Sequence, residues 1–195
     1  MDAIELLKHD HRMVEQLFVD YGGVGGTSGG ESAGGLKAGA ETQRRGVVEV
    51  VIRELSKHAA LEELVFYPFA KQLLPDGTEE IDRHLAEHMT VKRLLTALDG
   101  LSQGDDRESE LMERLAQETQ EHIREEEEDL MVKVAAAADP QALDELGEAI
   151  DKGKAVAPTR PHPNAPTEPP ALAMAAPVAA IYDRLRDRLQ GRPQT

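Results

Sequence analysis

Four long segments of this chain repeat apolar residues at helical spacing, and each interrupts its apolar face with at least one histidine. The segments cover about residues 2–21, 36–74, 78–101 and 106–138, and none shows the strict alternation of a half-buried strand. An imidazole on the buried face of every helix is costly unless the imidazoles share a common partner. The pattern therefore predicts an all-α fold whose helices pack around a polar centre.

The connections between these segments predict an antiparallel up-down-up-down four-helix bundle. A Gly-rich stretch over residues 22–35 is expected to form a loop after the first helix, and Thr78 is expected to cap the third. Asp139-Pro140 resembles an N-cap followed by proline at the first helical position, which predicts a short fifth helix. We expect the bundle over residues 1–138, the short helix over 139–152, and a Pro/Ala-rich tail with a terminal amphipathic segment over 153–195.

Seven polar residues interrupt the apolar faces, and their spacing indicates a metal centre. His58 and Glu62 lie at positions i and i+4, so both side chains are on one face of a helix and can reach one ion. Imidazole and carboxylate ligands suit iron, manganese or zinc, and seven of them exceed what one ion usually takes from a protein. Two ions bridged by carboxylates would use them all. The candidate ligands are His11, His58, Glu62, His84, His88, His122 and Glu126.

Composition and charge narrow the classes of function. The chain has no cysteine, which excludes thiolate zinc sites, iron–sulfur clusters and cysteine nucleophiles. Its formal net charge of -15 argues against nucleic acid and anionic membrane surfaces as main partners. No apolar run approaches the roughly 20 residues that span a bilayer, and the first residues lack the features of a signal peptide. We therefore expect a cytoplasmic protein.

The motifs resemble the hemerythrin-like HHE cation-binding family over about residues 2–135. They are Asp10-His11-Arg12, His58-Ala-Ala-Leu-Glu62-Glu63 with Phe66-Tyr67-Pro68 after it, His84-Leu-Ala-Glu-His88, and His122-Ile-Arg-Glu-Glu126-Glu127. The resemblance implies a bundle that holds a non-haem di-iron centre, oxo- or hydroxo-bridged, with the seven residues above as ligands. His84 matches an extra histidine that hemerythrins themselves have.

The carboxylate ligand of the fourth helix has two candidates. The HHE pattern places it four residues after His122, at Glu126, whereas the hemerythrin spacing places it five residues after, at Glu127. Helix geometry favours Glu126, which is rotated about 40° from His122, against about 140° for Glu127.

The expected function is binding of a small diatomic or peroxide ligand (oxygen, nitric oxide or peroxide) for sensing, carriage or the handling of iron and oxidants. An apolar lining from Leu7, Leu55, Phe66 and Leu115 is expected to keep the open coordination position dry. Catalase-like turnover of peroxide is the alternative that the resemblance implies. A remote alternative is a zinc hydrolase using His84-x-x-Glu87-His88, which leaves the other histidines unexplained. A ferritin-like centre needs Glu-x-x-His motifs on two helices, and the sequence has none at His88 or His122.

The end of the chain supplies the one indication of a protein partner. Apolar residues recur there at helical spacing, which predicts an amphipathic helix that could dock on the acidic bundle or on another protein. These residues are Val178, Ile181, Tyr182, Leu185 and Leu189.

Overall fold

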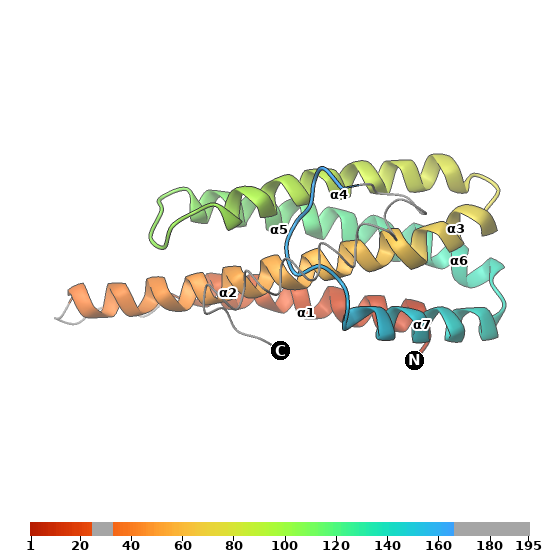
Figure 1. The fold of residues 1–195 in the computed structure, drawn as a ribbon, viewed down its shortest axis with the longest axis horizontal. Coiled ribbons are helices and arrows are strands. Elements are labelled where there is room, and N and C mark those ends of the chain that lie inside the picture. The colour runs from red at the N-terminus through yellow and green to blue at the C-terminus, as the bar shows by residue number, and fades with distance from the viewer. Residues whose placement is uncertain (25–32, 166–195) are drawn as a thin grey trace.

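The structure, a computed structural model, describes residues 1–24 and 33–165, and within those ranges every regular element is helical. The elements are α1 (Ala3–Gly23), α2 (Ala33–Leu61), η1 (Glu62–Phe66), α3 (Tyr67–Leu73), α4 (Gly77–Asp99), α5 (Glu108–Glu125), η2 (Glu126–Leu130), α6 (Met131–Ala137) and α7 (Pro140–Lys154). The predicted all-α bundle is confirmed, with successive long helices antiparallel (Figure 1).

Two of the long helices each contain one π-helical turn. α2, η1 and α3 follow one another without a break, as do α5, η2 and α6. The sequence predicts each as a single helix, over 36–74 and 106–138, because the apolar spacing does not reveal a turn wound with one extra residue. Pro68 lies in the first turn of α3, where its missing N–H removes a bond that an α-helix would need. Such π turns frequently occur at functional sites.

The four helices of the bundle enclose two apolar clusters, one toward each end. α1 contacts α2 and α5, and α4 contacts the same two helices, so the core is closed on all sides. One cluster gathers around Leu7, Phe66 and Leu130, and the other around Ile52, Leu95 and Leu115. Since each helix passes from one cluster to the other, the residues between the clusters form a layer in the middle of the bundle.

The helix ends agree with the expected capping at Asp139, differ from it at Thr78, and show a further cap at Asp2. Asp139 caps α7 by accepting a hydrogen bond from the backbone N–H of Gln141 at 2.8 Å, as the sequence predicts, and α7 runs two residues beyond the expected end, to Lys154. Asp2 caps α1 in the same manner. Thr78 does not cap α4, because a turn in which the N–H of Gly77 bonds the carbonyl of Leu74 begins the helix one residue earlier.

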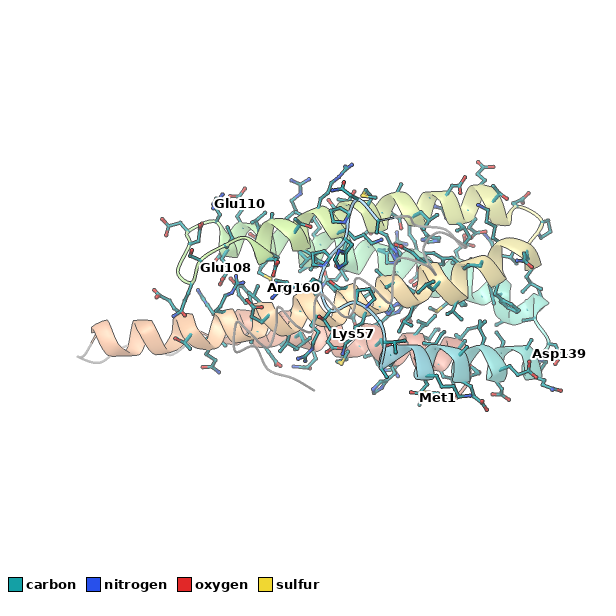
Figure 2. The ribbon with its side chains drawn as sticks, in the orientation of Figure 1. Met1, Lys57, Glu108, Glu110, Asp139 and Arg160 are labelled. Carbon is teal, nitrogen blue, oxygen red and sulfur yellow. The ribbon has the colours of Figure 1, made fainter. Side chains whose placement is uncertain are left out.

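The beginning of the predicted tail packs on the bundle. Residues 157–160 are buried, although their Pro/Ala-rich composition predicts little burial. Two ion pairs hold this segment: Lys154 Nζ lies 2.7 Å from Asp10, and Arg160, only 2% exposed, pairs with Asp99 at the end of α4. Figure 2 shows Arg160 on the segment that crosses the bundle from α7 toward α4. Basic residues of the tail therefore neutralise carboxylates of the acidic bundle.

Several expectations concern residues outside the described ranges. The Gly-rich loop expected over 22–35 is shortened, because α1 continues to Gly23 and α2 already begins at Ala33. The terminal amphipathic segment, residues 178–189, lies entirely outside the described residues. Among the helices of the described part, none is long and apolar enough to cross a membrane.

Gly147 allows α7 to approach the N-terminus closely, and this contact can be tested. A Cβ atom at Gly147 would lie 2.5 Å from the carbonyl oxygen of Met1 and 2.9 Å from the carbonyl carbon of Asp2. We expect Gly147→Ala to lower the free energy of unfolding by about 1 to 3 kcal/mol, because backbone must shift to admit the methyl group.

Gly46, inside α2, provides the matched control because a Cβ atom there meets nothing within 4 Å. Gly46→Ala should raise the free energy of unfolding by about 0.4 to 1 kcal/mol through lower entropy of the unfolded chain. Chemical denaturation of both variants measures the difference. Equal effects of the two substitutions would contradict the close approach of α7.

Candidate metal centre

The seven predicted ligands are all buried, and they come from the four helices of the bundle. α1 supplies His11, and α2 supplies His58 one turn before Glu62. α4 supplies His84 and His88, and α5 supplies His122 one turn before Glu126. Glu62 and Glu126 are the first residues of η1 and η2. The two π turns therefore begin where the carboxylates enter the polar layer.

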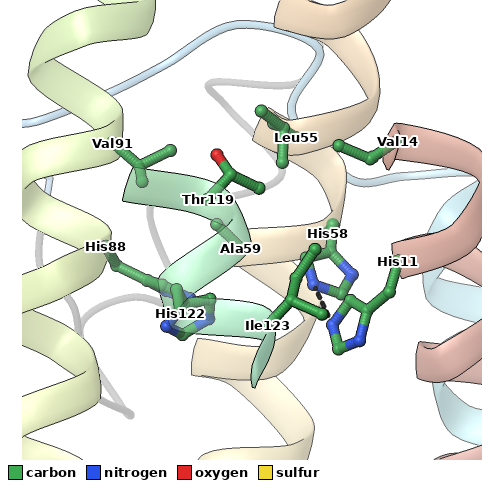
Figure 3. A pocket seen from close by; sticks show the side chains of 10 residues that line it. All are labelled: His11, Val14, Leu55, His58, Ala59, His88, Val91, Thr119, His122 and Ile123. Carbon is green, nitrogen blue, oxygen red and sulfur yellow. Dashed lines mark hydrogen bonds between the residues drawn. The ribbon is translucent and has the colours of Figure 1, made fainter. Parts of the chain in front are cut away.

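Six of the seven side chains converge in two groups that share Glu62. His11, His58, Glu62 and Glu126 form one group of potential ligand atoms, and Glu62, His88 and His122 form the other; within each group the atoms lie within 4.8 Å of one another. The Nε2 atoms of His11 and His58 are 3.1 Å apart, and so are those of His88 and His122 (Figure 3). Two nitrogens bound at right angles to one ion, each at about 2.1 Å, have about this separation.

The surroundings of the Glu62 and Glu126 carboxylates test whether this arrangement fits a metal. All four of their oxygens are buried, and none has a hydrogen-bond partner in the described part of the chain. Imidazole nitrogens are close: His58 Nε2 lies 3.1 Å from Glu62 Oε1, and His88 Nε2 lies 3.3 Å from Glu62 Oε2. Two unpaired carboxylates in a dry interior are strongly unfavourable, whereas cations between them and the imidazoles satisfy both. The donor set therefore fits bound metal.

A second set of carboxylates contacts three of the histidines at Nδ1, the ring nitrogen that faces away from the centre and is called the outer nitrogen below. Glu127 lies 2.8 Å from Nδ1 of His11. Glu63 lies 3.0 Å from Nδ1 of His88, and Glu87 lies 2.8 Å from Nδ1 of His122. A carboxylate at Nδ1 keeps the proton on that nitrogen and leaves the lone pair of Nε2 directed toward the centre, which is how metal-binding histidines are usually oriented.

This outer set contains residues that sequence reasoning missed. Glu63 is fully enclosed and also forms an ion pair with the buried Lys92, whose Nζ lies 2.6 Å and 2.7 Å from its two oxygens. Glu63 directly follows Glu62, and Glu87 directly precedes His88, so their positions in the motifs were visible. The sequence offered no signal for the pairing of Lys92 with Glu63, because the two are 29 residues apart.

The structure places Glu126 and Glu127 in different roles. Glu126 lies inside the first group, with Oε2 3.3 Å from His11 Nε2. Glu127 is 27% exposed and contacts the outer nitrogen of the same histidine. This arrangement agrees with the HHE spacing and not with the hemerythrin spacing.

His84 lies beside the centre and outside the two groups that share Glu62, and it forms a third group of possible ligand atoms with Glu87 and His122. Its ring stacks on Tyr67 with 6.0 Å between centroids, and its Nδ1 is 3.1 Å from Glu87. Its Nε2 is buried without a hydrogen-bond partner among the described residues. His84 and His88 share no candidate metal group in the described part of the chain, so the geometry gives no support to the hydrolase motif.

Tyr67 brings a hydroxyl to the edge of the centre. Its Oη lies 3.0 Å from Nε2 of His88. Burial and the nearby carboxylates of Glu126 and Glu62 raise the pKa of Tyr67 well above its ordinary value. Tyr67 is therefore a neutral hydrogen-bond donor next to a candidate ligand.

A small cavity of about 20 Å³ adjoins the imidazoles of four candidate ligands, His11, His58, His88 and His122 (Figure 3). This is more than the roughly 10–15 Å³ that one water needs, so the cavity admits a ligand of only a few atoms. Of the predicted lining residues, Leu55 lines the cavity, whereas Leu7, Phe66 and Leu115 belong to the apolar clusters instead. The remaining lining residues are Val14, Ala59, Val91, Thr119 and Ile123.

Protons compete for the centre when metal is absent. Burial lowers the pKa of His88, but its contacts with Glu62 and Glu63 raise it more strongly, to about 9. Burial likewise lowers the pKa of His11, and contacts with carboxylates, Glu126 first, raise it well above the ordinary value. On the outer side, burial raises the pKa of Glu87, while its contacts with His122 and His84 lower it to about 2.

The fold and the centre together define a class: a helical bundle whose middle layer holds histidines and carboxylates in an arrangement that fits metal cations. Comparison with known proteins agrees, because the model of the hemerythrin HHE cation binding domain matches residues 2–134. The chain belongs to this hemerythrin HHE family.

Two similar proteins extend the comparison. An uncharacterised hemerythrin-like protein of Schizosaccharomyces pombe is 31% identical over 142 residues, which cover 72% of this chain and 70% of the relative. The crystal structure of a hemerythrin HHE cation binding domain-containing protein from Mycobacterium kansasii matches with a TM-score of 0.61 and 22% identity, covering 80% of this chain and 86% of that one. The second likeness supports the fold alone.

The different positions of Glu126 and Glu127 lead to different expected losses. Glu126→Gln removes the charge inside the first group and should abolish retention of at least one metal ion. Glu127→Gln weakens only the orientation of His11 and should preserve metal stoichiometry with an affinity about tenfold lower. Metal analysis after dialysis against a chelator measures both variants, and a greater loss of metal in Glu127→Gln would contradict the assignment.

The raised pKa of His88 predicts opposite pH trends for the fold and for metal binding. In the metal-free protein, the charged form of His88 stabilises the fold below the unfolded pKa of about 6.5, and this contribution disappears as the pH rises through about 9. Metal affinity should rise over the same window, because the competing proton leaves.

His88→Gln supplies the control for this pH trend. Thermal unfolding of the metal-free proteins at pH values from about 6.5 to 9.5 should show a steeper loss of stability in the unmodified protein than in the variant. Parallel curves would show that His88 does not bind the extra proton.

Proposed function

We propose that the centre holds two iron ions and binds a small ligand, oxygen, nitric oxide or peroxide, for carriage, sensing or the handling of oxidants. The observation that carries the proposal is the sharing of Glu62 between two groups of imidazoles. A carboxylate whose two oxygens face different histidine sets is suited to bridging two ions. The small cavity next to four of the imidazoles supports a ligand of only a few atoms.

The donor set is compatible with iron. It offers only nitrogen and oxygen, in a proportion that suits iron, manganese and zinc, and the family resemblance favours iron. A pair of iron ions, when bound, supplies a coordination position for the ligand and the electrons for its reversible reduction. Residues of this chain set the conditions under which that chemistry proceeds.

Three groups of residues set those conditions. The outer carboxylates of Glu127, Glu63 and Glu87 keep protons on the Nδ1 atoms, so the Nε2 atoms stay available as ligands. The apolar walls of the cavity exclude larger molecules and most water. The hydroxyl of Tyr67 provides a neutral hydrogen-bond donor beside His88.

Peroxide turnover is the second candidate function, and the position of Tyr67 favours it. A hydroxyl 3.0 Å from His88 Nε2 is close enough to the centre to supply a proton during cleavage of an O–O bond. Binding remains the first choice, because Tyr67 does not line the cavity, and the described residues that do carry no ionisable proton apart from the imidazoles themselves.

Loading with ferrous iron under anaerobic conditions tests the proposal. We expect about two irons per chain, near-ultraviolet charge-transfer bands after exposure to oxygen, and a further band on addition of azide. His58→Ala should lose iron and these bands, whereas His9→Ala, which changes a surface histidine of α1, should retain them.

Oxygen evolution after addition of peroxide, absent in His58→Ala, would assign turnover instead of carriage. A colourless protein that binds one zinc and no iron would contradict the di-iron proposal altogether.

A further inference from the structure

The cavity beside the centre contains one polar group that is not an imidazole, the hydroxyl of Thr119. Thr119 lies on α5, is 2% exposed, and lines the cavity with Val14, Leu55 and Val91. Its Oγ1 is buried and has no hydrogen-bond partner in the described part of the chain, not even the carbonyl one turn earlier in its own helix. Every other non-histidine residue that lines this cavity is apolar.

An unpartnered hydroxyl at this position is unfavourable for the fold by itself. Burying a polar group without a hydrogen bond destabilises a protein, and valine has the same shape without that defect. Packing therefore does not explain threonine here. A partner that enters the cavity does explain it, because the hydroxyl would then form the bond it lacks.

The geometry indicates where such a partner would lie. Thr119 precedes His122 by three residues, so the two side chains are on the same face of α5 and about 4.5 Å apart along its axis. Figure 3 shows Thr119 beside Val91 and Leu55, across the cavity from the imidazoles. A ligand of two or three atoms with one end at the metal would extend its other end toward Thr119.

The side chain of Thr119 has the freedom to make this contact. In Figure 3 its hydroxyl is turned away from the imidazoles. Threonine in a helix has two side-chain rotamers of comparable energy, so the hydroxyl can turn when a ligand arrives. The same rotation lets it donate its proton without any movement of the backbone.

We propose that Thr119 is a specificity-determining residue that donates a hydrogen bond to the outer atom of the small ligand. The inference rests on the proposed function and deepens it, because it selects among small ligands. Those with a negatively charged or strongly accepting outer atom, such as azide or peroxide, gain the hydrogen bond. A hydrogen bond to a charged acceptor is stronger than one to a neutral acceptor, so the gain is largest for anions.

Thr119→Val tests this role, and azide is the probe. The variant keeps the shape of the side chain, so the metal-free protein should unfold at the same temperature as the unmodified one or higher. The iron-loaded variant should keep its iron content and bind azide about tenfold more weakly, as followed by the azide-dependent absorbance band. Thr119→Ser, which retains the hydroxyl, should bind azide within about threefold of the unmodified protein.

Ser56 offers a matched control on α2. Its hydroxyl is also buried and without a hydrogen-bond partner among the described residues, but Ser56 does not line the cavity. Ser56→Ala should therefore leave azide affinity unchanged. A similar loss of affinity in Ser56→Ala would show that removal of any buried hydroxyl perturbs the bundle, which would overturn the assignment to Thr119.

The experiment separates this inference from the proposed function. Equal azide affinity of Thr119→Val and the unmodified protein would overturn the role of Thr119 and leave the di-iron centre in place. Failure of the iron-loaded, unmodified protein to bind azide would overturn both.

Discussion

Two carboxylates without hydrogen bonds, in the dry middle of a helical bundle, are the constraint on which the rest of this structure depends. Glu62 and Glu126 are fully buried, and their charge is satisfied by metal cations or, in the metal-free protein, by protonated imidazoles beside them. The apolar clusters on either side make the constraint severe, because they keep water away from this layer. They also make the layer possible, since their packing on either side contributes to holding the four helices together. The bundle thus places unfavourable groups where bound metal, or protons on the imidazoles in its absence, compensates for them.

The carboxylates that contact the Nδ1 atoms orient the histidines of the centre. They differ in their burial and in the other residues that they contact. Glu63 is enclosed and paired with Lys92, so its contact with His88 lies in a low-dielectric environment and is protected from salt. Glu127 is partly exposed and contacts His11 near solvent and Lys8. Glu87 serves both His122 and His84. His88 is consequently supported by an enclosed carboxylate, whereas His11 and His122 are supported by carboxylates that are partly exposed, so the histidines of the centre are not equivalent.

Helical periodicity was sufficient to predict the bundle, and polar residues in the apolar faces indicated the candidate ligands, six of which lie together in two groups. Their burial could be predicted because the pattern is local: a histidine between Leu7 and Val14 must point inward with them. The π turns at Glu62 and Glu126 were not predictable, since one extra residue in a turn barely changes the apolar spacing. Contacts across the fold were also hidden, among them Lys92 with Glu63 and Arg160 with Asp99. The burial of residues 157–160 follows from such ion pairs and not from apolar composition. The Pro/Ala-rich composition of the tail therefore gave too low an expectation of its burial.

The cavity follows from the sizes of a few residues close to the ligands. Ala59, next to His58, is too small to fill the space that the four imidazoles leave, and Val14, Leu55 and Val91 close it from the side of one apolar cluster. The larger residues first expected there, Leu7 and Phe66, pack in the other cluster and cannot reach it. Because the cavity is small and nearly all apolar, one hydroxyl in its wall changes its chemistry more than it would at a wet surface. In the function we propose, ligand selection therefore depends on the wall of the cavity as well as on the metal, and Thr119 is the wall residue able to distinguish one small ligand from another.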